Sequence, residues 1–274
     1  FLYSKESHDE PERARNFLEM SKIRLFIVIT KLERGGAQLS TLELIKSLDK
    51  EVYEVSLLTT CEGSLLNDAS SIEGLKIIVM PSLRREINLF YDCRTLFLMY
   101  RLFKKEKPHV VHTHSTKAGI LGRWAARFAG VKSILHTIHG WEFHAYQNKL
   151  KRRSYIFLEK ITASFTDYLI AVTCHDIKQG LSFGIGREHQ YQLIRYGIDK
   201  KRFNVQSNGL LRKQYGISDA CFIVGMVACF KPQKAPLDFV FSAARVARQI
   251  SEVKFVMVGD GRMRAKIVRL IKRL

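Results

Sequence analysis

Short apolar runs rich in β-branched residues alternate with helical patterns along most of this chain. The first run, residues 23–29, is nearly continuous apolar sequence, which is typical of a strand buried on both faces of a sheet. Similar runs predict strands at 52–58, 75–80, 109–113, 133–137, 168–172 and 192–194. Helical patterns lie between them at 37–48, 95–105, 117–128, 150–165 and 175–183. This alternation predicts βαβ units and a mostly parallel, doubly wound α/β sheet.

The same alternation divides the chain into parts. Residues 1–21 are polar and have no periodicity that would bury a face, so we interpret them as a tail. A first domain is predicted at 22–199. After a polar stretch the pattern restarts, with strands at 222–227 and 253–258 and helices at 236–249 and 262–274. We therefore predict a second domain at 200–274, which is incomplete because two strands leave half of each apolar face without a partner.

Composition narrows the class of protein. Of the 274 residues 46% are hydrophobic, which excludes a disordered or collagen-like chain. The longest stretch without a charged residue, 220–230, is shorter than the ~20 residues of a spanning helix, and no secretory signal is recognisable. We therefore expect a cytoplasmic location. The five scattered cysteines are expected to be reduced and mostly buried.

The charge is strongly basic. With 45 Lys and Arg against 26 Asp and Glu, the net charge of +19 favours an anionic partner. Basic segments lie at 100–107, 149–153 and 262–274. Each is interpreted either as the solvated face of a packed helix or as a site of adsorption to an anionic membrane, on the inner face of the cell membrane. No nucleic-acid-binding motif accompanies them, so nucleic acid is not an expected partner.

Glycines and lysines follow several predicted strands. Gly35 and Gly36 stand where the first helix begins, and glycine there lets backbone N–H groups approach an anion. The alternative is an ordinary strand-to-helix turn, and the G-x-G-x-x-G fingerprint of dinucleotide sites is absent. In the second domain the residues that could neutralise or approach a diphosphate, or form only a solvated loop, are Lys231, Lys234, Gly259 and Gly261.

Six of the nine histidines fall at or near predicted strand ends: His109, His112, His114, His136, His139 and His144. His112 and His114 are two residues apart on a strand, so we expect them on the same face. Three interpretations stay open. The histidines could hold Zn²⁺, although no Asp or Cys stands at ligand spacing; one could orient a reacting sugar or phosphate; and at least half could simply be hydrogen-bonded residues at buried strands.

Six motifs occur in an order that resembles the glycosyltransferase group 1 family, the family 4 retaining glycosyltransferases. They are Gly35-Gly-Ala-Gln38, Val110-Val-His-Thr-His-Ser115 with Gly119 and Gly122-Arg123, Thr137-Ile-His-Gly140, Tyr196-Gly-Ile-Asp199, Lys231-Pro-Gln-Lys234 and Val256-Met-Val-Gly-Asp-Gly261. The resemblance is greatest to members that build bacterial surface polysaccharides. It implies a GT-B fold of two Rossmann-like domains. It also implies transfer of a sugar from a nucleotide-diphosphate sugar to a lipid-linked or glycan acceptor, with no metal or other cofactor.

The resemblance also implies roles for individual residues. His139 would be the catalytic residue beside the reacting sugar, and His114 would lie on the acceptor side. The donor would be bound by Gly35, Gly36, Lys231, Lys234, Gly259 and Gly261, with Lys234 stabilising the departing diphosphate.

Three departures from the family pattern bear on these roles. Cys229 stands where the family commonly has Arg, and Tyr196 replaces the usual Asn. No Glu-x7-Glu pair follows Gly261, so we expect this chain, which we interpret as truncated, to lack part of the donor site and to be inactive by itself. The alternatives to an enzyme of this family are a non-catalytic module that binds a glycan or an anionic membrane, and a metal hydrolase built on the histidines.

Overall fold

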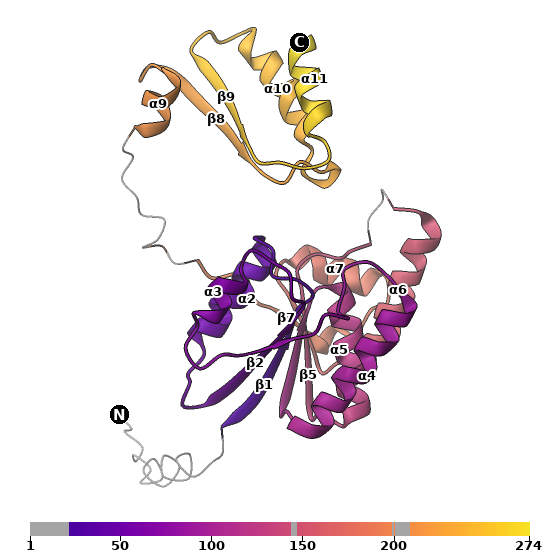
Figure 1. Ribbon diagram of the computed structural model, residues 1–274. Coiled ribbons are helices and arrows are strands. Elements are labelled where there is room, and N and C mark those ends of the chain that lie inside the picture. The colour runs from indigo at the N-terminus through magenta and orange to yellow at the C-terminus, as the bar shows by residue number, and fades with distance from the viewer. Residues whose placement is uncertain (1–21, 144–146, 199, 201–208) are drawn as a thin grey trace, which may run out of the picture. The chain divides into compact units, whose positions relative to one another are not determined.

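The computed structural model describes residues 22–143, 147–198, 200 and 209–274. The chain forms two compact units, Phe1–Ile198 and Asp199–Leu274, each with its own parallel sheet (Figure 1). The predicted α/β class is therefore confirmed. The tail at 1–21 and His144 lie outside the described residues, as does residue 199, so the domain boundary predicted there stays a prediction.

The sheet of the first unit has seven parallel strands in the order β3-β2-β1-β4-β5-β6-β7. They are β1 (Ile23–Val28), β2 (Tyr53–Thr59), β3 (Lys76–Val79), β4 (Val110–His114), β5 (Ser133–Ile138), β6 (Tyr168–Ala171) and β7 (Tyr191–Leu193). Each lies within a residue or two of its predicted range. The strand order reverses between β1 and β4, and in such sheets ligands bind beyond the carboxyl ends of the strands at this point.

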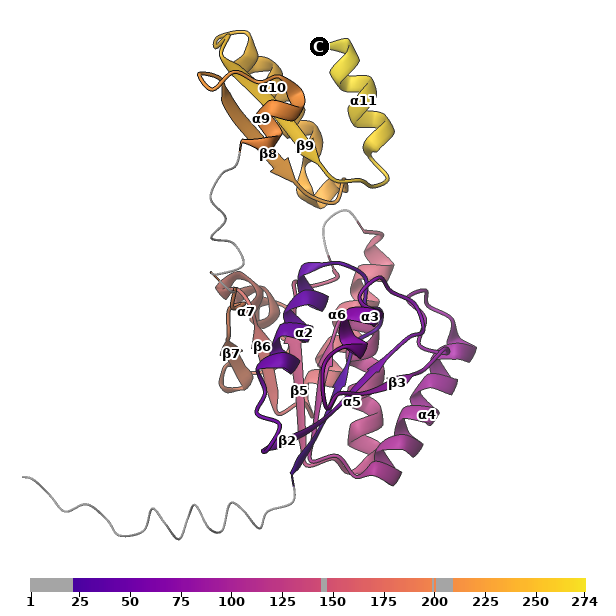
Figure 2. The ribbon, with the colours of Figure 1, turned by 60° about the vertical axis from the view of Figure 1, so that its left-hand side comes forward.

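Helices cover both faces of this sheet (Figures 1 and 2). They are α2 (Gly36–Ser47), α3 (Leu66–Ser70), α4 (Leu89–Glu106), α5 (Thr116–Ala129), α6 (Lys149–Ala163), α7 (Cys174–Ser182) and the 3₁₀ turn η1 (Glu188–Gln190). Phe26 and Val28 of β1 pack under α4 and α5, whereas Leu25 and Ile27 pack under α2 and α3. Because successive residues of a strand point to opposite faces, both sets are apolar and the run is continuous.

Two helices of the first unit differ from the prediction. The helix α4 begins six residues before the predicted start at 95, because the Asn88 side chain accepts a hydrogen bond from Tyr91 N at 3.2 Å and caps the helix. The five-residue α3 was not predicted, because so short a helix shows too few turns for its periodicity to be recognised.

The second unit has a two-stranded parallel sheet of β8 (Phe222–Val227) and β9 (Val253–Val258). Its helices are α9 (Leu210–Tyr215), the 3₁₀ turn η2 (Pro232–Lys234), α10 (Pro236–Ala247) and α11 (Arg264–Arg273). The buried core is small and centres on Phe230, Val240 and Ile267, the last from α11. Neither α9 nor η2 was predicted, since the region around each reads as polar loop.

Burial corrects one expectation about the cysteines. Cys221 is buried, whereas the other four are exposed: Cys61, Cys93, Cys174 and Cys229. All five are free thiols, as expected. The expectation that most are buried was wrong, because the positions of Cys93 and Cys174 on their helices face solvent rather than the sheet. Among the described residues, none of the helices combines the length and the apolar character that crossing a bilayer requires.

A buried ion pair joins α5 to α6. Arg123 and Glu159 have side-chain exposures of 0% and 2%, and Arg123 Nη2 lies 2.7 Å from Glu159 Oε2. Arg123 Nε also donates to the carbonyl of Gly119 at 2.9 Å, and Nη1 donates to Thr166 Oγ1 at 3.4 Å. These bonds compensate for the loss of water around the guanidinium. Burial of the ion pair is therefore stable only while all of these partners are present.

We predict that Glu159→Ala lowers the free energy of unfolding by about 3–5 kcal/mol, because it leaves the buried Arg123 charge unpaired. The matched control is Glu73→Ala, which breaks the exposed Lys50–Glu73 pair and should cost at most about 1 kcal/mol. Urea unfolding followed by circular dichroism measures both variants. Equal losses in the two variants would contradict the prediction.

Candidate functional site

Three histidines gather at the carboxyl ends of β4 and β5. His112 and His114 lie on the same face of β4, as predicted, with ring centroids 4.3 Å apart. His112 Nε2 lies 2.7 Å from Thr137 Oγ1, on the neighbouring strand β5. His139 follows the end of β5, and its Nε2 lies 2.9 Å from His114 Nδ1. We call His112, His114 and His139 the histidine cluster.

The cluster continues into Tyr196, which follows β7. The hydroxyl of Tyr196 is hydrogen-bonded to His139 Nδ1, and the two rings are stacked with centroids 5.7 Å apart. On the other side, Thr41 of α2 places its Oγ1 3.4 Å from His114 Nδ1. A hydrogen-bonded series therefore runs from α2 through β4 and the end of β5 to the segment after β7.

Burial keeps these imidazoles neutral. It lowers the pKa of His139 to about 4, and burial together with repulsion from His139 lowers the pKa of His112 to about 4. Burial, followed by repulsion from His112 and His139, holds the pKa of His114 well below its usual range. For Tyr196, burial and the negative charge of Asp176 raise the pKa to about 12, so its phenol keeps its proton at neutral pH.

Two other histidines have structural roles. His109 Nδ1 accepts a hydrogen bond from Arg24 N at 3.0 Å, at the opposite end of β4 from the cluster. His136 lies on the other face of the sheet, where its Nδ1 is 2.9 Å from Thr113 Oγ1. A Cβ on Gly119 would lie 2.6 Å from His136 Cε1, so this glycine lets α5 pack against the imidazole.

The start of α2 lies beside the cluster, because Thr41 belongs to its second turn. Gly35 is the N-cap residue, in an extended conformation, and no side chain caps the helix. The first turn contains no acidic residue. A Cβ on Gly36 would meet nothing within 4 Å, so Gly36 is not required for packing. The N–H groups of this helix end are the ones that could approach an anion.

The turn between β4 and α5 holds a strained residue, Ser115, whose conformation was not predicted from the sequence. Ser115 has φ 61° and ψ 154°, a conformation that residues with a side chain rarely adopt. Its Oγ lies 2.7 Å from Thr30 Oγ1, which follows β1. This bond ties the ends of β1 and β4 together at the point where the strand order reverses. No sequence signal marks such a conformation, since serine is common in turns.

In the second unit the predicted donor residues meet at the carboxyl end of the sheet. Lys231 directly precedes the 3₁₀ turn η2 and Lys234 ends it, after β8. Phe230 N donates to Asp260 O at 2.8 Å, which joins this segment to the turn after β9. A Cβ on Gly259 would clash with the carbonyl of Ala228, and one on Gly261 would lie 2.7 Å from the carbonyl of Phe230. Both glycines are therefore required for this close packing.

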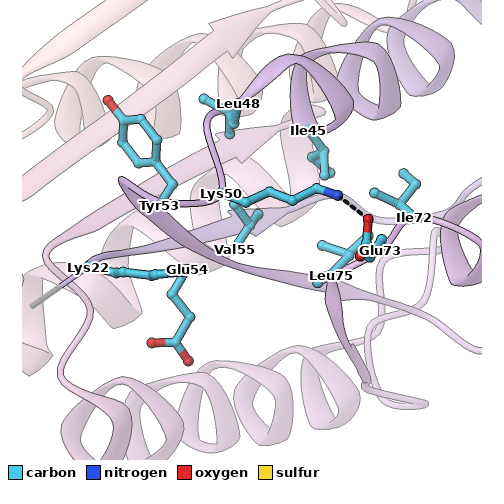
Figure 3. A pocket seen from close by; sticks show the side chains of 11 residues that line it. Lys22, Ile45, Leu48, Lys50, Tyr53, Glu54, Val55, Ile72, Glu73 and Leu75 are labelled. Carbon is cyan, nitrogen blue, oxygen red and sulfur yellow. Dashed lines mark hydrogen bonds and ion pairs between the residues drawn. The ribbon is translucent and has the colours of Figure 1, made fainter.

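The cavity shown in Figure 3 lies elsewhere in the first unit. It is lined by Lys22, Tyr53 and Leu75, which precede or begin β1, β2 and β3, and the Lys50–Glu73 ion pair spans one side. It therefore lies at the amino ends of these strands. Ligands of open parallel sheets bind at the carboxyl ends, so we do not assign this cavity to the functional site.

The metal-hydrolase alternative is not supported. His114 and His139 direct their ring nitrogens at each other, at hydrogen-bond distance. Within the residues that the structure describes, no three His, Cys, Asp or Glu side chains gather as metal ligands. The cluster is a set of neutral hydrogen-bonding groups.

Residues 34–202, which contain the whole cluster, match the family model described as Glycosyltransferase Family 4. The chain belongs to this family. Similar curated proteins include the UDP-Gal:alpha-D-GlcNAc-diphosphoundecaprenol alpha-1,3-galactosyltransferase of Escherichia coli. The E. coli enzyme is 32% identical to this chain, over 89% of the chain and 63% of the length of the E. coli enzyme. The Staphylococcus aureus capsular polysaccharide biosynthesis glycosyltransferase CapM is 22% identical over 88% of the chain and 62% of its own length. The chain thus spans less than two thirds of these relatives.

A solved structure of the same fold is that of Anabaena HepE in complex with UDP-glucose. It matches 92% of this family 4 chain and 66% of its own chain, with a TM-score of 0.71 and 16% identity. The predicted GT-B fold and the resemblance to enzymes of surface-polysaccharide biosynthesis are confirmed.

We predict that stability falls as the pH is lowered from about 6.5 to about 4. An unfolded histidine titrates near 6.5, whereas folded His112 titrates at about 4, so the unfolded state binds more protons in this window. The stabilisation is fully present above pH 6.5, and His112 alone accounts for a loss on the order of 3 kcal/mol at pH 4. Urea unfolding at several pH values measures it. His112→Gln should flatten this dependence, and an unchanged slope would contradict the assignment.

Proposed function

We propose that this chain carries the acceptor-binding unit and part of the donor-binding unit of a retaining glycosyltransferase of surface-polysaccharide biosynthesis. The reaction moves a sugar from a nucleotide-diphosphate sugar to a lipid-linked or glycan hydroxyl. The observation that carries this proposal is the neutral histidine cluster at the reversal of strand order, beside the uncapped start of α2. The printed names of the galactosyltransferase and of CapM support the reaction class.

The charges and protonation states of the side chains support a role for each group in the transfer reaction. The bond between the anomeric carbon and the diphosphate breaks, and the acceptor oxygen forms the new bond. In the second unit, the cations of Lys231 and Lys234 stabilise the departing diphosphate. In the first unit, the N–H groups at Gly35 and Gly36 can approach an anionic group. With a pKa of about 4, His139 is too weak a base to take the acceptor proton. That proton leaves with the diphosphate, the strongest base at the reacting centre.

We predict that Lys234→Ala lowers kcat by about 10²–10³-fold, because it removes a cation from the departing diphosphate. The assay follows transfer from UDP-galactose to GlcNAc-diphosphoundecaprenol, the substrates in the name of the E. coli relative, by the protein that contains this chain. Lys254→Ala, on β9 away from the turns, is the matched control and should leave kcat unchanged. Equal activity of the two variants would remove Lys234 from the site.

An exposed apolar and basic surface of the first unit supports the proposal of a lipid-linked acceptor. The helix α5 packs between α4 and α6, and both flanking helices begin at the carboxyl end of the sheet (Figure 1). Leu89 and Phe90, at the start of α4, are 79% and 71% exposed, and Leu150, at the start of α6, is 74% exposed. The basic residues close to them in the sequence are Arg84, Arg85, Lys149, Lys151, Arg152 and Arg153. We call these residues the apolar-basic rim.

We predict that the apolar-basic rim binds anionic vesicles. Leu89→Glu with Phe90→Glu should weaken binding to vesicles containing phosphatidylglycerol by tenfold or more, because burying each side chain contributes about 1.5–3 kcal/mol. Phe128→Glu changes an exposed residue at the other end of α5 and serves as the control. Flotation at low and high salt measures binding, which salt should weaken. Binding that is insensitive to the double substitution would place the contact elsewhere.

A further inference from the structure

Both ring nitrogens of His139 are occupied by the protein. Nε2 is hydrogen-bonded to His114 Nδ1 at 2.9 Å, and Nδ1 is hydrogen-bonded to the Tyr196 hydroxyl. An imidazole has only these two polar atoms. The side chain that the family resemblance identifies as catalytic therefore has no nitrogen left for a substrate in this arrangement.

The hydrogen bonds of Thr41 determine where the proton of His114 lies. Thr41 Oγ1 donates its only hydrogen to the carbonyl of Ala37 at 2.8 Å. At its 3.4 Å contact with His114 Nδ1 it can therefore only accept, so Nδ1 must carry the hydrogen. The same N–H points to His139 Nε2, which accepts.

The buried face of His114 agrees with this placement. Its side chain is 2% exposed, and its Nε2 has no hydrogen-bond partner among the described residues. With the hydrogen on Nδ1, the unpaired atom is an acceptor lone pair. The opposite tautomer would bury an unpaired N–H donor, which folded proteins almost never do.

The protonation of His139 follows from that of His114. Neutral His139 accepts at Nε2, so its hydrogen is on Nδ1 and is donated to the oxygen of Tyr196. The hydrogen of the Tyr196 hydroxyl is not used in this bond. Tyr196 is 41% exposed, so at the solvent end of the series it presents an O–H donor whose oxygen is held from behind.

We propose that Tyr196 binds the lipid-linked acceptor. It donates its hydroxyl hydrogen to an oxygen of the acceptor's sugar diphosphate, with His139 and His114 as positioning residues. This inference rests on the proposed glycosyl transfer for the identity of the ligand. It gives a role to the tyrosine at a position where the family usually has asparagine. A phenol with its oxygen fixed by His139 has one remaining direction for its hydrogen, which makes the contact specific.

The proton positions can be measured on this chain without any substrate. Long-range ¹H–¹⁵N spectra of the imidazoles distinguish the two neutral tautomers, and we expect Nδ1–H for both His114 and His139. Tyr196→Phe should shift the Nδ1 resonance of His139, which loses its acceptor. Tyr168→Phe removes another exposed hydroxyl, at the amino end of β6, and should leave that resonance unchanged. A hydrogen on Nε2 of His139 would overturn the inference.

Substrate binding tests the second half of the inference. The probe is GlcNAc diphosphate carried on a short prenyl chain, and calorimetry with the chain gives its Kd. We expect Tyr196→Phe to raise the Kd about tenfold, the contribution of one hydrogen bond, and Tyr168→Phe to leave it unchanged. Equal affinity of Tyr196→Phe and the unaltered chain would overturn the inference alone. Absence of binding by the unaltered chain would overturn the acceptor class of the proposed function as well.

Discussion

The parallel pairing of β1 with β4 is the constraint on which the rest of the site depends. From β1 the chain adds β2 and then β3 along one edge of β1. It then returns to place β4 along the opposite edge of β1. Because the connections leave in opposite directions there, the carboxyl ends of β1 and β4 stay uncovered. The pairing of Val28 with Thr113 and the bond between Thr30 and Ser115 fix the two ends at this point.

Most polar groups at this point are buried with a hydrogen-bond partner, and the exception among the described imidazole nitrogens is His114 Nε2. An unpaired or charged imidazole in the protein interior is costly, and the structure avoids both costs by neutral rings and mutual hydrogen bonds. The same principle applies on the other face of the sheet, where Arg123 is fully buried but bonded to Glu159, Gly119 and Thr166. The ion pair fixes α5 to α6, so helix positions behind the site are held by polar as well as apolar contacts.

The second unit depends on close backbone packing rather than on a large core. Gly259 and Gly261 let the turn after β9 lie against the segment after β8, and this places Lys231 and Lys234 at one end of the sheet. The sheet itself leaves Phe222 and Val227 well exposed. The carboxyl end of this sheet therefore holds two lysines and the start of α10, beside two glycines that no other residue can replace without displacing the backbone.

Much of the fold follows from the sequence, because β1 and its neighbours are buried on both faces and so appear as continuous apolar runs. That His112 and His114 lie on the same face of the sheet follows from the two-residue period of a strand. The start of α4 was missed because one side chain, Asn88, extends the helix beyond its apolar pattern. The exposure of Cys93 was not predicted, because the sequence pattern of a helix does not show which of its residues face the sheet until the packing of the helix is known.

The sequence by itself determined the order of the strands and helices and the residue types available at the strand ends. Only the tertiary structure decided which of them meet. His109, His112 and His136 look equivalent in the sequence, yet the structure separates them. His109 lies at the amino end of β4, His112 lies in the histidine cluster, and His136 lies on the opposite face of the sheet. Tyr196 lies 57 residues beyond His139 in the chain, and the hydrogen bond between them exists only because β5, β6 and β7 lie side by side. Local sequence determines the direction of a side chain, whereas its partners depend on contacts between distant segments.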